Sequence, residues 1–180
     1  MGLVTLTQFN TYTGNLETGE AVNSMKNNIL AAAEEIVVEH LGYNPVSGAH
    51  EDIISGIGNN RLYLFAHPVT SVTAVSIDGV ALDLSEISLH DTYIRRSQGI
   101  FPNGVDNVSV SYVAGWAQNA IPDTIITAIL QIASLMLQET GGNIGITGKS
   151  YAENSRTFIN YTNFSKWLQK LDSFRIVRFV

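Results

Sequence analysis

The chain has 180 residues, of which 45% are hydrophobic and 14% are charged, so it is long enough to bury one sizeable core and has the usual size of a single domain. It contains no cysteine, which excludes disulfide bonds, thiolate metal sites and a thiol nucleophile. Ten basic and sixteen acidic side chains give a formal net charge of −6, and this charge is unevenly distributed.

The two parts of the chain carry opposite charge. Residues 1–148 hold four basic and fourteen acidic side chains, whereas residues 149–180 hold six basic and two acidic ones. Such an asymmetry indicates a basic arm that meets an acidic surface, either nucleic acid or another protein. A solvated amphipathic helix with scattered lysines accounts for the same charges equally well.

Targeting and membrane signals are the next feature to consider. The first residues, MGLVTLTQFNTYTGN, lack a basic segment followed by an apolar run. The longest apolar stretch, at 125–137, is too short to span a bilayer. We therefore expect a soluble protein that is made in the cytoplasm and has no membrane partner.

Two helices are predicted in the first 41 residues. Residues 5–13 form a short helix after the potential cap Thr5. In residues 20–41 the apolar positions recur every three or four residues, which predicts an amphipathic helix that ends before Gly42. These positions are Val22, Met25, Ile29, Ala32, Ala33, Ile36 and Val37.

The pattern then changes from loop to strand. Residues 43–60 are rich in Gly, Asn and Ser, which predicts a loop that completes an N-terminal segment 1–60. Residues 61–115 are expected to form an antiparallel β insertion, with Asp78-Gly79 as a two-residue hairpin turn. The expected strands are Arg61–Phe65, Val69–Ile77, Ile87–Leu89, Tyr93–Arg95, Gly99–Phe101 and the alternating run Val108, Val110 and Tyr112.

The rest of the chain returns to helix. Pro122 and Asp123 suit a first helical turn, and 121–140 is predicted to be the central, most buried helix. A mobile loop at 141–160 and an amphipathic helix with a tail at 161–180 follow. The expected fold is α+β but mainly α: one domain, 1–180, built as a helical bundle with an antiparallel β insertion between the second and central helices.

One segment imitates a phosphate-binding loop. Residues Gly142 to Ser150 contain Gly148-Lys149-Ser150, but the glycine required five residues before Gly148 is replaced by Asn143. The segment also follows a helix where such loops follow a strand. A connecting loop explains its glycines better.

Metal or catalytic chemistry has little support. His50-Glu51-Asp52 and His90-Asp91 are runs of adjacent residues, whose side chains diverge on an extended backbone, and neither has the spacing of helical metal ligands. No serine lies in a G-x-S-x-G turn. We expect no enzyme activity, no metal and no cofactor.

Aromatic side chains fall into two groups. Tyr112 and Trp116 stand at a strand-to-helix junction, where core packing is the better interpretation. Tyr151, Phe158 and Tyr161 lie in a segment with little other apolar content, which favours contacts with a neighbouring subunit.

Three motifs in a fixed order carry a family resemblance. They are a proline-led hairpin (Pro68, Val69, Val72, Val75, Asp78, Gly79), a strand end (Val110, Tyr112, Ala114, Gly115) and a helix led by Pro122. Over about residues 20–180 the chain resembles the head-tail connector (adaptor, head-completion) proteins of tailed bacteriophages. The first 20 residues match only loosely, and the β insertion is longer than in the smallest members.

The resemblance implies a structural protein of the virion neck. It implies a homo-oligomeric ring, commonly a dodecamer, between the portal protein and the stopper or tail-completion protein, with DNA passing through the lumen without sequence-specific binding. The family's basic tail implies that Arg175, Arg178 and Phe179 dock to the portal. The resemblance carries no catalytic residue.

Two other function classes stay open. A small nucleic-acid-binding module would use the basic groups Lys149, Arg156, Lys166, Lys170, Arg175 and Arg178, and its affinity would fall steeply with added salt. An enzyme with an unrecognised site is the third class.

Overall fold

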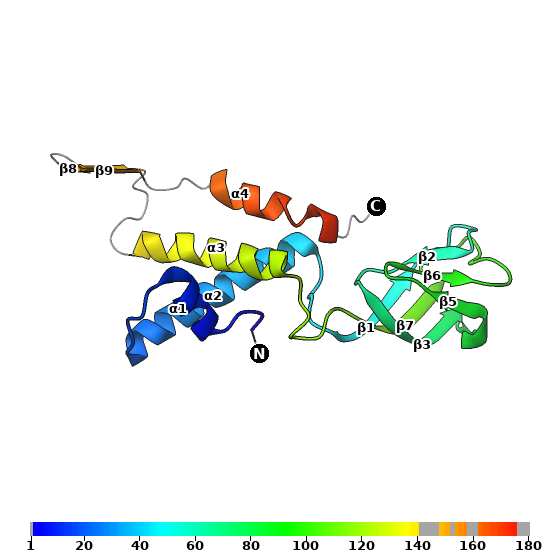
Figure 1. Ribbon diagram of the computed structural model, residues 1–180. Helices are drawn as coiled ribbons and strands as arrows, with labels where there is room; N and C mark the ends of the chain where they lie inside the picture. Colours follow the sequence, from blue (N-terminus) through cyan, green and yellow to red (C-terminus); the bar gives the residue numbers. More distant parts are fainter. Residues whose placement is uncertain (1, 141–147, 152–153, 158–161, 176–180) are drawn as a thin grey trace. The chain divides into compact units, whose positions relative to one another are not determined.

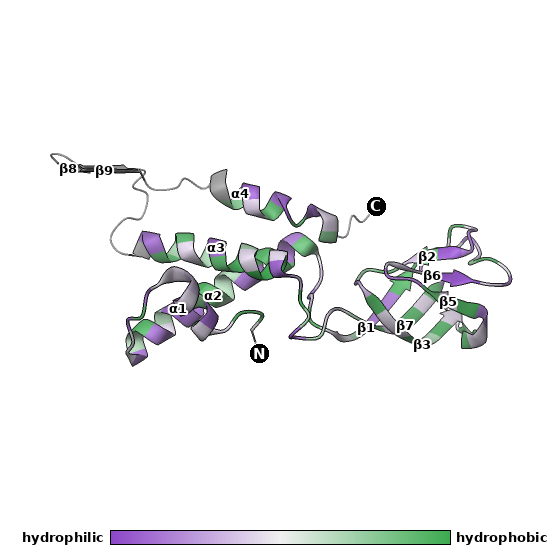
Figure 2. Cartoon of the chain, in the orientation of Figure 1, coloured by the Kyte–Doolittle hydropathy of each residue, from purple (hydrophilic) through white to green (hydrophobic). Residues whose placement is uncertain are grey.

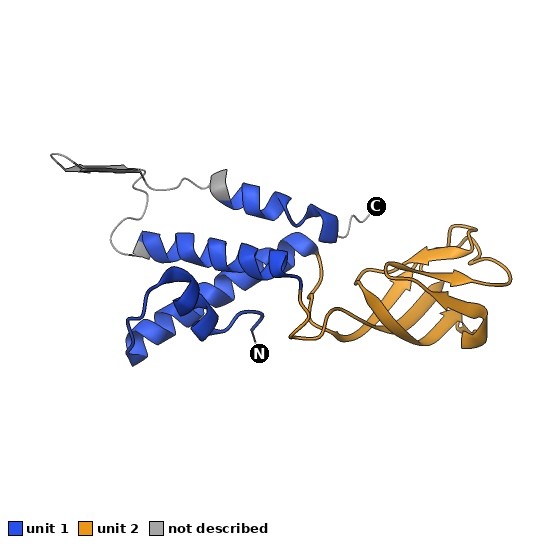
Figure 3. Cartoon of the chain, viewed as in Figure 1, with its two compact units in different colours: residues 1–41, 122–175 blue, residues 42–121, 176–180 orange. Residues whose placement is uncertain are grey.

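The computed structural model describes residues 2–140, 148–151, 154–157 and 162–175. The chain forms two compact units, one from Met1–Leu41 and Pro122–Arg175 and the other centred on Gly42–Ile121 (Figure 3). The β unit is thus inserted in the chain between the two segments of the helical unit. The chain leaves the helical unit where one predicted helix ends and returns where the next begins.

The helical unit contains the predicted helices (Figure 1). They are α1 (Leu6–Thr13), α2 (Glu20–Leu41), α3 (Asp123–Thr140) and α4 (Thr162–Gln169), followed by the short 3₁₀ turn η2 (Asp172–Phe174). The Thr5 hydroxyl accepts from the Gln8 N–H, and the Gln8 side chain accepts from the Thr5 N–H, so a capping box begins α1. The helices expected at 5–13, 20–41 and after Pro122 are confirmed.

Helix α3 supplies much of the apolar core of this unit. It packs against α2, α1 and α4, and hydrophobic and hydrophilic residues alternate along it (Figure 2). Its buried side chains are Ile125, Ala128, Ile129, Leu130, Ile132, Ala133 and Leu135. Every exposed fraction in this set is 9% or less, which confirms the deep burial predicted for this helix.

A buried lysine holds the connection between α1 and α2. The side chain of Lys26 is 0% exposed. Its ammonium group donates to Asn10 Oδ1 at 2.8 Å, to the Glu17 carbonyl at 2.9 Å and to the Asn15 carbonyl at 3.0 Å. Because a buried cation is tolerated only when its hydrogen bonds are satisfied, Lys26 fixes the path of residues 14–19.

The β unit contains two antiparallel sheets. The first has the strand order β1 (Gly48–Ile54), β7 (Val108–Ala114), β3 (Val69–Ile77) and β4 (Val80–Ala81). The second has the order β2 (Arg61–Tyr63), β6 (Tyr93–Arg96) and β5 (Ile87–Leu89), with the 3₁₀ turn η1 (Leu84–Glu86) before it. Strand β7 alternates strictly between buried and half-buried positions, so one face of the first sheet is the core face.

Two expectations for this unit are wrong. Residues 43–60 are not simply a loop, because β1 lies within them and pairs with β7 over its whole length. Residues Gly99–Phe101 do not form a strand, and only a single bridge joins Phe101 to Asn59. The unit therefore begins before the predicted boundary at residue 61.

The predicted hairpin turn is confirmed. Asp78 and Gly79 join β3 to β4 with φ angles of 51° and 79°, as a type I′ turn requires. Gly115 ends β7 with a φ of 102°, and a Cβ atom there would lie 2.7 Å from the Val46 carbonyl. Only glycine allows this approach of the two backbones.

The segment after α3 also differs from expectation. Residues Gly148–Tyr151 (β8) and Asn154–Thr157 (β9) pair as antiparallel strands inside the range 141–160 that was predicted to be a loop. Residues 141–147, 152–153 and 158–161 lie outside the described residues. Helix α4 (Thr162–Gln169) lies within the range 161–180 that was predicted to hold the last helix and the tail.

Candidate functional site

A buried polar network joins β1 and β7 to the segment after β2. The Tyr112 hydroxyl donates to Asp52 Oδ2 at 2.6 Å and accepts from the Ala66 N–H at 3.0 Å. Asp52 Oδ2 also accepts from the Phe65 N–H at 2.8 Å. Burial and the Asp52 carboxylate raise the pKa of the Tyr112 phenol far above its ordinary value, so the phenol stays protonated.

This network accounts for the run His50-Glu51-Asp52, which was considered as a metal site. Asp52 is turned into the core, while Glu51 on the opposite face of β1 is exposed. The His50 ring stacks on its cross-strand partner Tyr112, with 5.4 Å between the ring centroids. Within the described residues no group of three His, Asp or Glu side chains is arranged to hold a metal ion.

The phosphate-loop imitation has the wrong surroundings. Lys149 and Ser150 lie in strand β8, with Lys149 opposite Arg156 of β9. The next described helix, α4, begins only at Thr162. A phosphate loop needs a helix N-terminus at its lysine, so the described segments do not form one.

The structure describes few of the predicted interface residues. Phe158, Tyr161, Arg178 and Phe179 lie outside the described residues, and for Tyr151 only the backbone, in β8, is described. Arg175 is exposed just after η2. The described residues therefore do not test either predicted interface group.

The predicted nucleic-acid-binding residues are also only partly described. Lys166 is exposed on α4 and Lys170 is exposed just after it, with the Lys170 ammonium group 3.8 Å from the centre of the Trp167 ring. Lys149 and Arg156 face each other across β8 and β9 in backbone register. No described helix is both long and apolar enough to cross a bilayer.

The outer face of the second sheet carries a basic and aromatic surface that sequence reasoning missed. Arg61 lies directly opposite Arg95, and Tyr63 lies opposite Tyr93, in the pairing of β2 with β6. The Tyr93 ring is stacked on His90, with 4.3 Å between centroids, and the Arg61 guanidinium group lies 5.4 Å from the centre of the same ring. We call these five residues the Arg61–Arg95 face.

The Arg61–Arg95 face is open to solvent. Tyr63 is 60% exposed, and Arg61, His90 and Arg95 are also exposed. The opposite side of the same sheet is turned to the core, where Leu62 and Ile94 are buried. Alternation of the side chains thus separates a buried apolar face from an exposed basic one.

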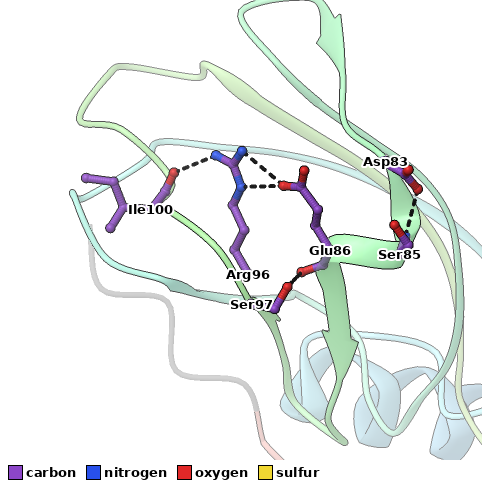
Figure 4. A network of polar contacts seen from close by, with 6 residues as sticks. All are labelled: Asp83, Ser85, Glu86, Arg96, Ser97 and Ile100. Atoms are coloured by element: carbon purple, nitrogen blue, oxygen red, sulfur yellow. Dashed lines mark hydrogen bonds and ion pairs between the residues drawn. The ribbon is translucent and has the colours of Figure 1, made fainter.

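The neighbouring Arg96 does not belong to this face. Its guanidinium group donates twice to Glu86 Oε2, at 3.2 Å each, and once to the Ile100 carbonyl at 3.1 Å (Figure 4). In the same network Ser97 donates its hydroxyl to the Glu86 carbonyl. Arg96 is therefore neutralised locally, whereas no ion pair within the described residues involves Arg61 or Arg95.

Comparison with solved structures finds the same fold in particle necks. A chain in the neck of an empty gene transfer agent (GTA) particle computed with C6 symmetry has a TM-score of 0.61 and 15% identity, with 99% of this chain and 92% of that chain covered. The virion of the native GTA particle gives the same values. The neck of the native particle computed with C12 symmetry gives 0.59 and 14%, with 97% and 90% covered.

Comparison at the level of sequence finds nothing. No family model matches the chain, and no curated protein is significantly similar to it. At 14–15% identity the structural likeness establishes the fold, which is that of chains found in these phage-like particles.

Proposed function

We propose that the chain is a structural subunit of the neck of a tailed-phage-like particle. The observation that carries the proposal is the likeness to chains of GTA particles, which covers at least 97% of this chain and 90% of each neighbour. Both units take part in such a match, so it does not rest on one common helical or β motif. The order of motifs from Pro68 to Pro122 supports the same proposal independently.

The proposed assembly is a ring of twelve copies, in keeping with the C12 symmetry with which the neck of the native GTA particle was computed. The ring joins the portal to the stopper or tail and leaves a passage for DNA. Acidic side chains outnumber basic ones fourteen to four in residues 1–148, so a passage lined by this part would make few phosphate contacts. Few phosphate contacts mean weak binding, which lets DNA move.

The portal contact is assigned to the basic end of the chain. Arg175 is exposed, and Arg178 and Phe179 follow it in sequence. Tyr151, Phe158 and Tyr161 are assigned to the contact with the neighbouring subunit. The proposal gives the protein no catalytic role and no cofactor.

Co-sedimentation with purified portal tests the proposal. We expect the full chain to bind portal. The double variant Arg175→Glu/Arg178→Glu should bind at least about tenfold more weakly, because the new glutamates would be repelled by the acidic portal surface that the arginines are proposed to contact. Lys166→Glu/Lys170→Glu makes the same change of net charge on α4 and at the residue that follows it, and serves as the matched control.

Three outcomes are informative. Undiminished binding by Arg175→Glu/Arg178→Glu removes the tail from the portal contact. Absence of the wild-type chain from portal-bearing heads contradicts the neck role itself. Tight binding to short duplex DNA that weakens steeply with salt would favour the nucleic-acid-binding module instead.

A further inference from the structure

The Arg61–Arg95 face holds two like charges with no counter-charge. Residues directly opposite in an antiparallel pair have Cβ atoms about 4.5–5.5 Å apart, and like charges in that position destabilise the pairing. Arg61 and Arg95 occupy such a position. No ion pair within the described residues relieves this repulsion, so both guanidinium groups are open to an anionic partner.

The charge around the face makes it distinct. Of the four basic residues in 1–148, Lys26 is buried and Arg96 is paired with Glu86, so Arg61 and Arg95 are the two exposed and unpaired cations of residues 2–140. The β unit otherwise carries the carboxylates Glu51, Asp52, Asp78, Asp83, Glu86, Asp91 and Asp106.

Helix α2 carries the opposite arrangement. Glu35 and Glu39 are exposed and lie four residues apart, so they are neighbours on one helix face and repel each other. No ion pair within the described residues includes either carboxylate. The inward stripe of α2 is formed by other residues, Lys26, Leu30, Ala33, Val37 and Leu41.

We propose that the Arg61–Arg95 face binds the Glu35–Glu39 side of α2 in a second copy of this chain. One copy offers two uncompensated cations on a rigid sheet, and the other offers two uncompensated carboxylates on a rigid helix. Joining them relieves both repulsions. Arg and Tyr are also the residue types that most often dominate protein interfaces.

This contact is heterologous, because it joins two different surfaces. A heterologous contact repeated from copy to copy closes into a ring when the rotation allows it. The inference therefore deepens the proposed function and rests on it for the ring. It names the surfaces that join neighbouring subunits through described residues.

DNA is a weaker candidate for the same face. Two arginines give about two phosphate contacts, and the salt dependence and affinity of DNA binding scale with that number. The seven carboxylates of the β unit repel the same phosphates. An acidic protein surface is the better partner for two arginines, and the chain itself provides one, since its sequence pI is about 5.1.

Charge exchange tests the contact. Arg61→Glu/Arg95→Glu and Glu35→Lys/Glu39→Lys should each weaken self-association at least about tenfold, measured by analytical ultracentrifugation at about 50 mM salt. A one-to-one mixture of the two variants should associate again, because each intact or exchanged surface meets a partner of opposite sign. The chain carrying all four substitutions should recover association by itself.

Two matched controls separate this contact from net charge. Glu17→Lys/Glu20→Lys alters two other exposed carboxylates, and Lys166→Glu/Lys170→Glu alters two other exposed cations. Both should associate like the wild type. Circular dichroism of every variant shows whether a loss of association comes from loss of folding.

Several results would overturn the inference. They are a wild-type chain that stays monomeric at every concentration, a mixture of variants that does not recover, or controls that weaken association equally. Binding of a DNA duplex that Arg61→Glu/Arg95→Glu abolishes would assign the face to nucleic acid. Normal incorporation of Arg61→Glu/Arg95→Glu into particles would reject this face and leave the neck role intact.

Discussion

Replacing Tyr112 by Phe should destabilise the β unit strongly. The variant loses the hydroxyl that donates to Asp52 at 2.6 Å and accepts from the Ala66 N–H at 3.0 Å. A hydrogen bond to a charged group contributes about 1.5–3 kcal/mol, and a buried N–H left without a partner costs about 1–3 kcal/mol. Because the phenol no longer has to leave water, part of this loss is recovered. We expect the free energy of unfolding to fall by about 2–4 kcal/mol.

The two tryptophans allow each unit to be followed separately. Trp116 lies in the β unit and Trp167 in the helical unit. In a Trp167→Phe background, urea denaturation followed by Trp116 fluorescence reports the β unit, and the midpoint should shift without a change of slope. Tyr63→Phe is the control, because Tyr63 is 60% exposed, and it should change stability by less than about 0.5 kcal/mol. Equal effects of the two variants would refute the role of the network.

Three further predictions concern the cores of the two units. Burial raises the pKa of the Tyr43 and Tyr112 phenols in the folded protein. The free energy of unfolding should therefore be unaffected by them below about pH 10 and should fall above it, by about 1.4 kcal/mol per pH unit for each phenol. Tyr112→Phe should remove one of these two contributions when denaturation is measured as a function of pH. Ile129→Asp puts an unpaired charge at a position 0% exposed and should prevent folding, whereas Thr124→Asp in the exposed first turn of α3 should not; an unchanged melting temperature for Ile129→Asp would contradict the burial of this helix. Lys26→Met should lower stability by about 1–3 kcal/mol and speed amide hydrogen exchange in α1, while the exposed Asn28→Met should leave both unchanged.

Strand β1 shows why part of the β unit escaped prediction. Its inward positions are His50, Asp52 and Ile54, so the core face of this strand is largely polar. Strand prediction relies on apolar residues at alternate positions, and that signal is missing here. Asp52 is accepted in the core because the Tyr112 hydroxyl, from β7, and the Phe65 N–H, from the segment after β2, both donate to its carboxylate. These partners are distant in the chain.

The Arg61–Arg95 face shows the same limit for a candidate site. The spacing Arg61-x-Tyr63 and Tyr93-x-Arg95 places each pair on one side of its own strand, and this much is readable from residues alone. That the two pairs meet depends on the pairing of β2 with β6, whose partner residues are 30 to 34 positions apart in the sequence. Surfaces of this kind are therefore decided by strand register.

Local physical chemistry determined the rest. The periodic apolar stripe of α2, the first turn at Pro122 and the Asp78-Gly79 turn each depend on neighbouring residues, so the sequence by itself determined these helices and this hairpin. Tertiary structure alone decided the division into two units, the burial of Lys26 and the pairing of β1 with β7. These features depend on contacts between segments far apart in the chain, whose energies no local pattern encodes.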